Sequence, residues 1–500
     1  MSAVFDVYLL SKNVGQLTFN DDATMAFQYS KDYVDNAVAG TPILSVRFPI
    51  RSEAYNNKET FIFLSNLFPE GKVMERIEKI LRLNSEDIQR LIEVMGGDFA
   101  GAIELFPQDY LKPALGQSKK LNETQLSNLI NKIEVNPFHV NDKNHKEDGT
   151  PNRTRMSLAG AQPKLPVFVE INDDGNLNFY DSLDQPSTHI IKPPRNDKEF
   201  PYLVINEYIC MTAAARSGLT VAPVTLLDYH NADGDEDTAL LVERYDRKIS
   251  GGHIERIHQE DLCQICGFPP GSKYEMNTDT GMPGYKAGPG IKELFTTIRD
   301  KSTLPIKDLQ ECGFRIFFSI ICGNDDAHAK NFSFLHLDNG RLTLTPAYDL
   351  VSTQVYPLEH LMAMNFGAVR CVQEIKRSDL DLYFQDTGLG GRQLMKIYLR
   401  FCDEALSSIL SVIKEVSADL YLDSEIRMVS KLADISTANH TLLVKRLEEY
   451  SHGVTPVYPG PENRKTKPFE SKRTHGATAN HPDSKHKQTK PFGSNHNRRE

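Results

Sequence analysis

An apolar segment that runs directly into a dense polar cluster constrains the fold of this chain more than any other feature. Residues 314–322 (FRIFFSIIC) are mostly hydrophobic and predict a deeply buried helix. Residues 323–331 (GNDDAHAKN) follow at once, and six of these nine side chains are ionisable or carry an amide. The cluster is therefore the first candidate for a functional site, placed at the end of a core helix.

A hairpin is predicted immediately after this cluster. Asn339-Gly340 is the dipeptide most favoured in two-residue hairpin turns, and strand-like residues flank it on both sides. Centring the hairpin on this turn pairs residues whose numbers sum to 679, which places Asn331 opposite Tyr348 and beside Asp349. The register therefore predicts that Asn331 and Asp349, distant in sequence, meet at the open end of one hairpin.

The side chains gathered at this point suit a magnesium ion with a bound phosphate. The amide of Asn331 and the carboxylates of Asp349 and Asp326 are hard oxygen ligands, which suit Mg²⁺ rather than zinc. The simpler alternative is that Asp325, Asp326 and Asn331 cap turns, as polar residues after helices usually do. His328 can equally be a loop histidine with satisfied hydrogen bonds or a phosphate contact.

The charge distribution separates an acidic body from a basic tail. The chain has 500 residues, with 57 Lys and Arg against 67 Asp and Glu, a net charge of −10. Residues 461–500 hold ten Lys or Arg and four Asp or Glu, so this tail carries +6 and residues 1–460 carry −16. An acidic body argues against nucleic acid or an anionic membrane as its direct partner. The low-complexity tail is expected to be disordered.

Neither a membrane segment nor a disulfide framework is predicted. No run of about 18 apolar residues occurs. The N-terminal stretch contains Asp6 and has no basic flank, unlike a secretory signal. The seven scattered cysteines fit reduced thiols. We therefore expect a cytoplasmic protein with no membrane partner.

Four regions are distinguished by their patterns along the chain. Residues 1–107 alternate strand-like and helical stretches and predict a compact α+β unit. Residues 108–247 contain a helix, a hairpin, a strand, a second helix and two further strands, whereas residues 248–455 are mainly helical. Residues 456–500 form the basic tail.

The order of these parts matches the order of the working parts of a protein kinase. A kinase presents a phosphate-covering loop, a strand lysine, a helix glutamate, a hinge, a catalytic Asp with a metal-binding Asn, and a metal-binding Asp. Each part alone is a weak signal here, because the loop has a single glycine and neither a D-F-G nor an H-R-D string occurs. Their order, however, is hard to obtain by accident. The corresponding positions are residues 157–164, Lys192, Glu207, residues 243–245, Asp326 with Asn331, and Asp349.

Longer motifs carry a more specific resemblance. They are FLSNLFPEG, GGDFAGAIELFP, SLAGAQPKL, STHIIKPP, NEY, VERYDR, IHQEDLCQ, KYE with a following GPG, NDDAHAKNFS and LTPAYDL. Together they resemble the HipA family of bacterial serine/threonine kinases, over roughly residues 5–449.

The resemblance implies an α+β, kinase-like fold of two lobes, with an N-terminal α/β half, an extra N-terminal subdomain and a mainly helical C-terminal half. It implies that the chain is the toxin of a toxin–antitoxin pair and is restrained by a small helix-turn-helix partner. The chain would contact DNA only indirectly, through that partner. Family members act on translation components such as aminoacyl-tRNA synthetases, so a protein of that kind is the implied substrate. ATP and Mg²⁺ are the implied cofactors. Self-phosphorylation on Ser157 would expel the phosphate loop and silence the enzyme.

The roles of the family's site residues carry over by motif. Asp326 would be the catalytic base, chosen over Asp325 because it lies five residues before Asn331. Asn331 and Asp349 would hold Mg²⁺ between the nucleotide phosphates, and Lys192 would neutralise phosphate charge. The other implied ATP contacts are Ala159, Gly160, Ala161, Gln162, Pro163, Lys164, Glu243, Arg244, Tyr245, His328, Ala329, Lys330 and Tyr348.

Two other functions stay open at this point. A nucleotide-binding module could act chiefly as a corepressor with a DNA-binding partner, without kinase turnover. A metal-dependent phosphohydrolase could be built on the Asp/His/Asn cluster, but it would leave Lys192 and the hinge pattern unexplained.

Overall fold

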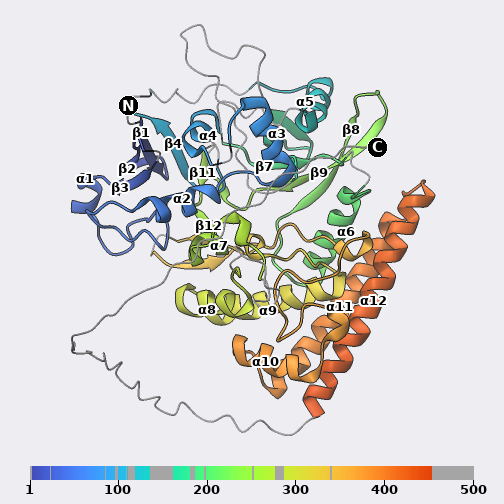
Figure 1. Cartoon of the computed structure of the whole chain (residues 1–500). Helices are drawn as coiled ribbons and strands as arrows, with labels where there is room; N and C mark the ends of the chain where they lie inside the picture. Colours follow the sequence, from blue (N-terminus) through green and yellow to red (C-terminus); the bar gives the residue numbers. More distant parts are fainter. Residues whose placement is uncertain are drawn as a thin grey trace, which may run out of the picture. The chain divides into compact units, whose positions relative to one another are not determined.

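The computed structural model describes residues 3–452, apart from gaps at 23, 85, 96–98, 109, 111–118, 136–161, 181–185, 196–198, 251–252, 276–286 and 338–339. Ser157, residues 159–161 of the predicted phosphate loop and the tail at 456–500 therefore lie outside the described residues. The described helices and antiparallel sheets form an α+β fold (Figure 1). None of these helices is long and apolar enough to cross a membrane. All seven cysteines are free thiols.

A four-stranded antiparallel sheet organises the N-terminal subdomain. Its order is β3-β2-β1-β4, so β4 returns from a distant part of the subdomain to pair with β1. Alternate residues of β1 enter the core, where Phe5, Val7 and Leu9 are buried. Helices α2 and α4 pack against the sheet. The elements are β1 (Ala3–Leu9), β2 (Lys12–Phe19), β3 (Met25–Tyr29), α1 (Lys31–Asp35), α2 (Asn57–Ser65), α3 (Gly71–Leu81), α4 (Ile88–Met95) and β4 (Ile103–Pro107).

A second antiparallel sheet, of five strands, lies between two hydrophobic cores. Its order is β6-β5-β7-β9-β8. On β9, Ala239 and Leu241 pack into the core of the N-terminal subdomain, because alternate residues of a strand face opposite sides. Leu240 and Val242 pack into the core of the helical half. The elements are α5 (Glu123–Val135), β5 (Leu165–Ile171), β6 (Leu177–Tyr180), β7 (His189–Lys192), α6 (Leu203–Arg216), β8 (Val224–His230) and β9 (Glu236–Glu243).

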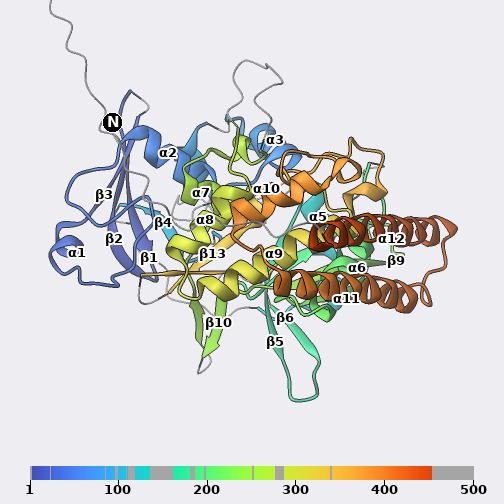
Figure 2. The ribbon, with the colours of Figure 1, turned by 90° about the horizontal axis from the view of Figure 1, so that it is seen from below.

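The helical half is built around α9, the helix that the apolar segment predicted. Its last turn is buried, and Gly323 ends it with a φ of +71°. α9 packs against α8, α11 and α12, and the long helices α11 and α12 lie side by side (Figure 2). The elements are β10 (Arg247–Ser250), β11 (His253–Arg256), β12 (Gln259–Asp261), α7 (Leu262–Cys266), η1 (Pro270–Ser272), α8 (Ile291–Lys301), α9 (Pro305–Cys322), η3 (Ala329–Asn331), β13 (Ser333–His336), β14 (Leu342–Leu344), η4 (Thr353–Val355), η5 (Val372–Glu374), α10 (Arg377–Thr387), α11 (Arg392–Val416) and α12 (Asp423–His452).

The hairpin after α9 forms, but the predicted register is wrong by one residue. β13 and β14 pair residues whose numbers sum to 678, as in Phe334 opposite Leu344. The Leu337 N–H donates to the Arg341 carbonyl oxygen at 2.8 Å, so three positions of the sequence, the last of them Gly340, separate the paired residues instead of two. Gly340 has a φ of +71°, the left-handed conformation that a three-residue hairpin loop needs at its last position. The Asn-Gly dipeptide therefore supplies its glycine to a longer loop.

Candidate active site

One cavity of about 500 Å³ collects side chains from the N-terminal subdomain, the five-stranded sheet and the loops after α9. Asn331 and Asp349 share this cavity, although the β13–β14 ladder ends before it reaches either residue. The predicted site residues that line it are Gln162, Lys164, Lys192, Glu243, Arg244, Tyr245, Asp326, His328, Lys330, Asn331, Tyr348 and Asp349.

Lys192 lies at the centre of a buried group of charges. It is the last residue of β7, and its side chain is 7% exposed. Its Nζ donates to Glu207 Oε1 at 2.5 Å and to Asp349 Oδ1 at 2.8 Å. Glu207 lies on α6 and its side chain is 1% exposed. One ammonium group thus joins a strand, a helix and the loop after β14.

The charges of Lys192 and Asp349 stabilise each other. Burial by itself would lower the pKa of Lys192, but the carboxylates of Asp349 and Glu207 outweigh that effect and raise it. Burial would raise the pKa of Asp349, but Lys192 and Lys164 outweigh it and hold this pKa well below its ordinary value. Both groups are therefore charged at neutral pH. The Asp349 side chain is 38% exposed and lines the cavity.

Asp349 adopts an unfavourable backbone conformation. Its φ is +60°, a value that residues with a side chain rarely adopt. Such conformations persist where the surrounding structure fixes them, and they are common at functional sites. The chain before it is fixed twice: the Tyr348 hydroxyl donates to the Lys330 carbonyl oxygen at 2.7 Å, and the Ala347 N–H donates to the Thr220 carbonyl oxygen at 2.8 Å. These contacts hold the carboxylate of Asp349 at Lys192.

Side-chain hydrogen bonds fix the loop between α9 and β13. The Asn324 side-chain oxygen accepts from the Asp326 backbone N–H at 3.1 Å, and Asn331 Nδ2 donates to the Asp326 carbonyl oxygen at 3.0 Å. The His328 N–H donates to the same carbonyl oxygen at 2.7 Å. The backbone of Asp326 is therefore held on both sides, while the residue itself stays exposed.

The adjacent carboxylates of Asp325 and Asp326 have different surroundings. Asp325 is buried and accepts from Gln354 Nε2 at 3.0 Å, and its N–H donates to Thr353 Oγ1 at 2.8 Å. These bonds fasten the loop to η4. Asp326 lines the cavity, and its Oδ1 accepts from the Tyr274 hydroxyl at 2.7 Å. The geometry gives Asp325 a structural role and leaves Asp326 accessible to a substrate.

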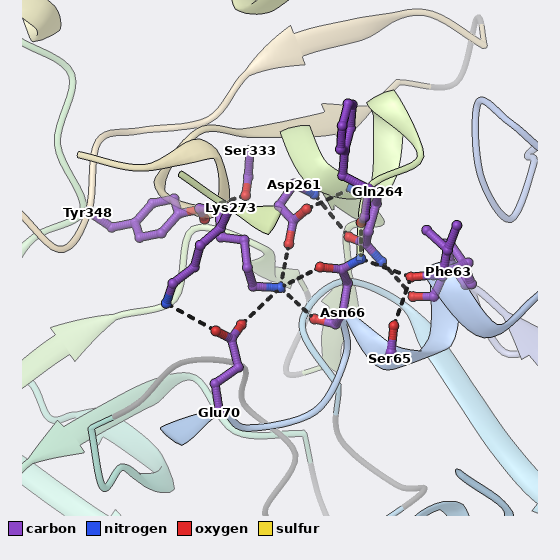
Figure 3. A network of polar contacts seen from close by, with 12 residues as sticks. Phe63, Ser65, Asn66, Glu70, Asp261, Gln264, Lys273, Ser333 and Tyr348 are labelled. Carbon is purple, nitrogen blue, oxygen red and sulfur yellow. Dashed lines mark hydrogen bonds and ion pairs between the residues drawn. The ribbon is translucent and has the colours of Figure 1, made fainter. Parts of the chain in front are cut away.

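Lys330 ties the loop after α9 to the N-terminal subdomain. Its Nζ donates to the Asn66 carbonyl oxygen at 2.9 Å, to the Asn66 side-chain oxygen at 3.0 Å and to Asp261 Oδ2 at 2.9 Å. Glu70 Oε1 lies 3.5 Å from the same nitrogen, and Glu70 Oε2 accepts from Lys273 Nζ at 3.0 Å. Asn66, Asp261 and Glu70 point toward one another in Figure 3, and the contacts given above place the Lys330 ammonium group between them. Protein oxygens thus surround the charge of Lys330.

The segment predicted as a hinge is fixed to the N-terminal subdomain. Arg244 donates to the two carboxylate oxygens of Asp246 at 2.9 and 2.8 Å. Asp246 Oδ2 also accepts from the Gly101 N–H at 2.7 Å, and Gly101 belongs to the motif GGDFAGAIELFP. Arg244 therefore anchors the hinge, and Glu243 and Tyr245 line the cavity beside it.

The described end of the predicted phosphate loop lies at the cavity. Of the described residues of this loop, Gln162 and Lys164 line the cavity and Pro163 does not. Burial and the nearby Lys192 ammonium lower the pKa of Lys164 to about 8. Ala329, another predicted ATP contact, is fully buried and lies outside the cavity lining.

The residues predicted to hold Mg²⁺ supply suitable oxygen atoms. Asp349 is ionised, and Asn331 uses its Nδ2 as a donor to Asp326, which leaves its Oδ1 as an acceptor. Within the described ranges, no group of three or more His, Cys, Asp or Glu forms a metal site. A kinase site does not need one, because nucleotide phosphates and water supply the remaining ligands. One carboxylate and one amide are the protein donors that such a site requires.

Several cavity residues lie in the quoted motifs without having been predicted to act at the site. Asn66 and Glu70 belong to FLSNLFPEG, Asp261 belongs to IHQEDLCQ, and Lys273 and Tyr274 belong to KYE. Their membership in these motifs was the signal in the sequence that could have identified them as site residues. Lys273 and Glu70 are 203 positions apart, so no local pattern could pair them.

Comparison with known proteins places the chain in a family. Residues 5–106 match the HipA N-terminal domain, and residues 156–409 match the HipA-like C-terminal domain. The chain belongs to the HipA family. In this HipA-family chain the two matched regions meet at one cavity, which contains Glu70 from the first and Asp326 from the second.

Individual HipA-family relatives are similar over most of their length. The chain is 32% identical over 449 residues to the putative kinase Y4mE of Sinorhizobium fredii. The aligned region covers 88% of this chain and 98% of the relative. It is 31% identical over 421 residues to the serine/threonine-protein kinase toxin HipA of Shewanella oneidensis. This aligned region covers 82% of this chain and 89% of the relative. The solved complex of Shewanella oneidensis HipA, HipB and operator DNA matches with a TM-score of 0.72 and 27% identity, over 90% of this chain and 100% of that chain. The predicted kinase-like α+β fold is confirmed.

Proposed function

We propose that this HipA-family chain is an ATP-dependent protein serine/threonine kinase. The observation that carries the proposal is a single cavity in which Lys192, paired with Glu207 and Asp349, lies together with Asp326 and Asn331. Kinases use a strand lysine paired with a helix glutamate, together with an Asp and an Asn, to neutralise and orient nucleotide phosphates. A site built only for phosphate hydrolysis would leave the Lys192–Glu207 pair without a role.

Each side chain has a part in moving the γ-phosphoryl group of ATP to a serine or threonine hydroxyl. Lys192 neutralises charge on the α- and β-phosphates. Asp326 accepts the proton of the attacking hydroxyl while the new O–P bond forms and the bond to ADP breaks. Asn331 and Asp349 would hold Mg²⁺, which supplies further charge stabilisation to the phosphates. Positioning and charge neutralisation supply most of the rate, so no covalent enzyme intermediate is needed.

The nucleotide base and the phosphate loop complete the proposed site. Glu243 and Tyr245 would contact adenine through the hinge backbone, and residues 159–164 would cover the phosphates. Self-phosphorylation of Ser157 would expel that loop and silence the enzyme. The resemblance of SLAGAQPKL to the family motif supports this part of the proposal.

The biological role that we infer is that of the toxin in a toxin–antitoxin module. One relative is named a serine/threonine-protein kinase toxin, and a matching solved structure contains HipA with HipB and operator DNA. A HipB-like helix-turn-helix protein would be the partner, and this chain would reach DNA through it, since residues 1–460 carry a net charge of −16. The substrate would be a host protein, with an aminoacyl-tRNA synthetase as the first candidate.

Transfer of label from γ-labelled ATP tests the proposal. The purified chain should incorporate label in the presence of Mg²⁺, and Ser157→Ala should lose most self-incorporation while it still binds ATP. Label on Ser157→Ala at the wild-type level would contradict the assignment of that serine. No label in the wild-type chain or in host proteins, at saturating Mg²⁺, would contradict the kinase proposal and favour a nucleotide-binding corepressor.

A further inference from the structure

We propose that Tyr274 is a positioning residue that orients the carboxylate of Asp326. The inference rests on the proposed function, in which Asp326 is the catalytic base. The Tyr274 hydroxyl donates to Asp326 Oδ1 at 2.7 Å. Asp326 is exposed, and within the described ranges this is the hydrogen bond that fixes its carboxylate. A hydroxyl held on one carboxylate oxygen leaves the other to accept the proton of the substrate.

The residue before Tyr274 is fixed to the N-terminal subdomain and to the loop after α9. Lys273 Nζ donates to Glu70 Oε2 at 3.0 Å. The Lys273 carbonyl oxygen accepts from the Ala329 N–H at 3.1 Å. Because Ala329 lies three residues after Asp326, the tyrosine backbone is tied to the same loop that carries its hydrogen-bond partner.

The residue after Tyr274 is fixed to the helical half. The Glu275 N–H donates to the Ala363 carbonyl oxygen at 2.9 Å, and the Ala363 N–H donates to the Asp325 carbonyl oxygen at 2.8 Å. Glu275 Oε2 accepts from the Asn365 N–H at 2.8 Å. A second chain of hydrogen bonds thus leads from the tyrosine to the residue that precedes the proposed base.

The GPG motif packs directly against the KYE motif. The Gly288 N–H donates to the Tyr274 carbonyl oxygen at 3.0 Å. A Cβ atom at Gly288 would lie 1.9 Å from the Ser272 carbonyl oxygen, and one at Gly290 would lie 2.2 Å from the Glu275 carboxylate. Side chains at these positions would force the neighbouring chain to move, so glycine permits the close approach. Two motifs that are separate in the sequence therefore form one support for the tyrosine.

The ring of Tyr274 packs edge-on against His328. The ring centroids are 5.3 Å apart and the planes are inclined by 84°. Burial and the Asp326 carboxylate raise the pKa of the Tyr274 hydroxyl, so it stays protonated and donates. Backbone and ring contacts therefore place this hydroxyl independently of Asp326, and the carboxylate adopts the orientation that the hydroxyl selects.

The same hydrogen bond allows a second interpretation, with an opposite consequence. The Tyr274 hydroxyl could occupy the place of the substrate hydroxyl and would then have to leave before transfer. Loss of the hydroxyl would slow transfer if Tyr274 orients Asp326, and it would leave transfer unchanged or accelerate it if Tyr274 blocks the site.

Tyr274→Phe tests the inference, because it removes the hydroxyl and keeps the ring on His328. With γ-labelled ATP and the chain itself as acceptor, we expect the first-order rate constant of self-labelling to fall at least tenfold, while the ATP concentration that gives half the maximal rate and the Tm stay unchanged. The matched control is Tyr33→Phe, which loses a hydroxyl bond of 2.8 Å to the Pro42 carbonyl oxygen and should keep the wild-type rate. An unchanged or raised rate constant of self-labelling for Tyr274→Phe would overturn the inference.

A double variant shows whether Tyr274 acts through Asp326. On the residual transfer of Asp326→Asn, the added change Tyr274→Phe should have no further effect, because groups that act as a unit are not additive. A second tenfold loss in the double variant would contradict the inference. Wild-type transfer by Asp326→Asn, or no transfer by the wild-type chain, would contradict the proposed function and the inference with it. If only Tyr274→Phe is without effect, the inference alone fails.

Discussion

At the residue scale, two neighbouring lysines in the cavity have pKa values that move in opposite directions. Lys192 bonds directly to Glu207 and Asp349, and these carboxylates raise its pKa against the effect of burial. Lys164 is buried beside the charge of Lys192, and its pKa falls to about 8. Lys192 is therefore a permanent charge of the site, whereas Lys164 can lose its proton slightly above physiological pH.

Raising the pH above 8 should therefore weaken ATP binding. The phosphates favour the charged form of Lys164. In the free protein this lysine loses its proton near pH 8, because its pKa lies well below that of an ordinary lysine. The Kd for ATP should rise about fivefold between pH 8 and pH 9, since the charged fraction falls by that factor. Calorimetric titration measures the effect. Lys164→Arg stays charged and should remove the pH dependence; the same dependence in both proteins would contradict the assignment.

Replacing Lys192 should destabilise the fold. Lys192→Met leaves Glu207, whose side chain is 1% exposed, as a buried carboxylate without its partner. The free energy of unfolding should fall by about 3 to 5 kcal/mol. Burial raises the pKa of Glu207, so the loss should shrink as the pH falls and the carboxyl group takes up a proton.

Urea unfolding with an exposed ion pair as the control measures this effect. Lys72 and Glu199 pair at 2.9 Å with side chains 55% and 50% exposed, so Lys72→Met should cost less than about 1 kcal/mol. An equally small loss for Lys192→Met would show that Glu207 does not depend on Lys192.

At the scale of elements, the loop after α9 is held by parts of the chain far from it in sequence. Asn66, in the loop after α2, and Asp261, at the end of β12, both accept from Lys330. Lys330 precedes Asn331 and lies four residues after Asp326. The placement of both proposed functional residues therefore depends on contacts with other elements.

Lys330→Met should consequently impair transfer more than nucleotide binding. The loop would lose its tie to Asn66 and Asp261, so we expect kcat for label transfer to fall at least tenfold while the Kd for ATP changes less than threefold. The free energy of unfolding should also fall by about 3 kcal/mol, because Asp261 loses its cation. A large rise in the Kd with an unchanged kcat would instead assign the ammonium group to the nucleotide.

The sequence predicted these elements better than their connections. The buried helix over residues 314–322, the strand that carries Lys192 and the helix that carries Glu207 were predicted, and they form parts of α9, β7 and α6. The register of the β13–β14 hairpin did not follow, because an Asn-Gly pair fits a two-residue turn as well as a three-residue loop that ends in glycine. The local turn preference of Asn-Gly therefore did not decide between a two-residue turn and a three-residue loop.

At the scale of the whole molecule, the N-terminal subdomain forms part of the wall of the cavity that we propose as the active site. Its hydrophobic core extends onto one face of the five-stranded sheet, where it includes Ile191 and Leu241, and its Glu70 lines the cavity. The pattern of residues 1–107 predicted an α+β unit but gave no contact between Glu70 and Lys273, since such pairs are set only by the folded chain. The kinase-like order of parts, by contrast, was readable because those parts are consecutive in sequence.

The charge of the whole molecule fits this assignment. Residues 1–460 carry −16, and the proposed phosphate site brings Lys164 and Lys192 together inside that acidic body. In the proposed account, binding of an anionic nucleotide is a local property of the cavity, and binding of DNA would be left to a partner.

The comparison of phosphopeptides from host cells that express matched variants tests the central claim most directly. Asp326→Asn removes the proposed base, whereas Asp325→Asn changes the neighbouring carboxylate and keeps an oxygen for Gln354. New phosphoserine or phosphothreonine peptides should appear with the wild-type chain and with Asp325→Asn, and should fall by about 10²-fold or more with Asp326→Asn at equal protein level and ATP affinity. The same new peptides at the same abundance with Asp326→Asn would contradict the account.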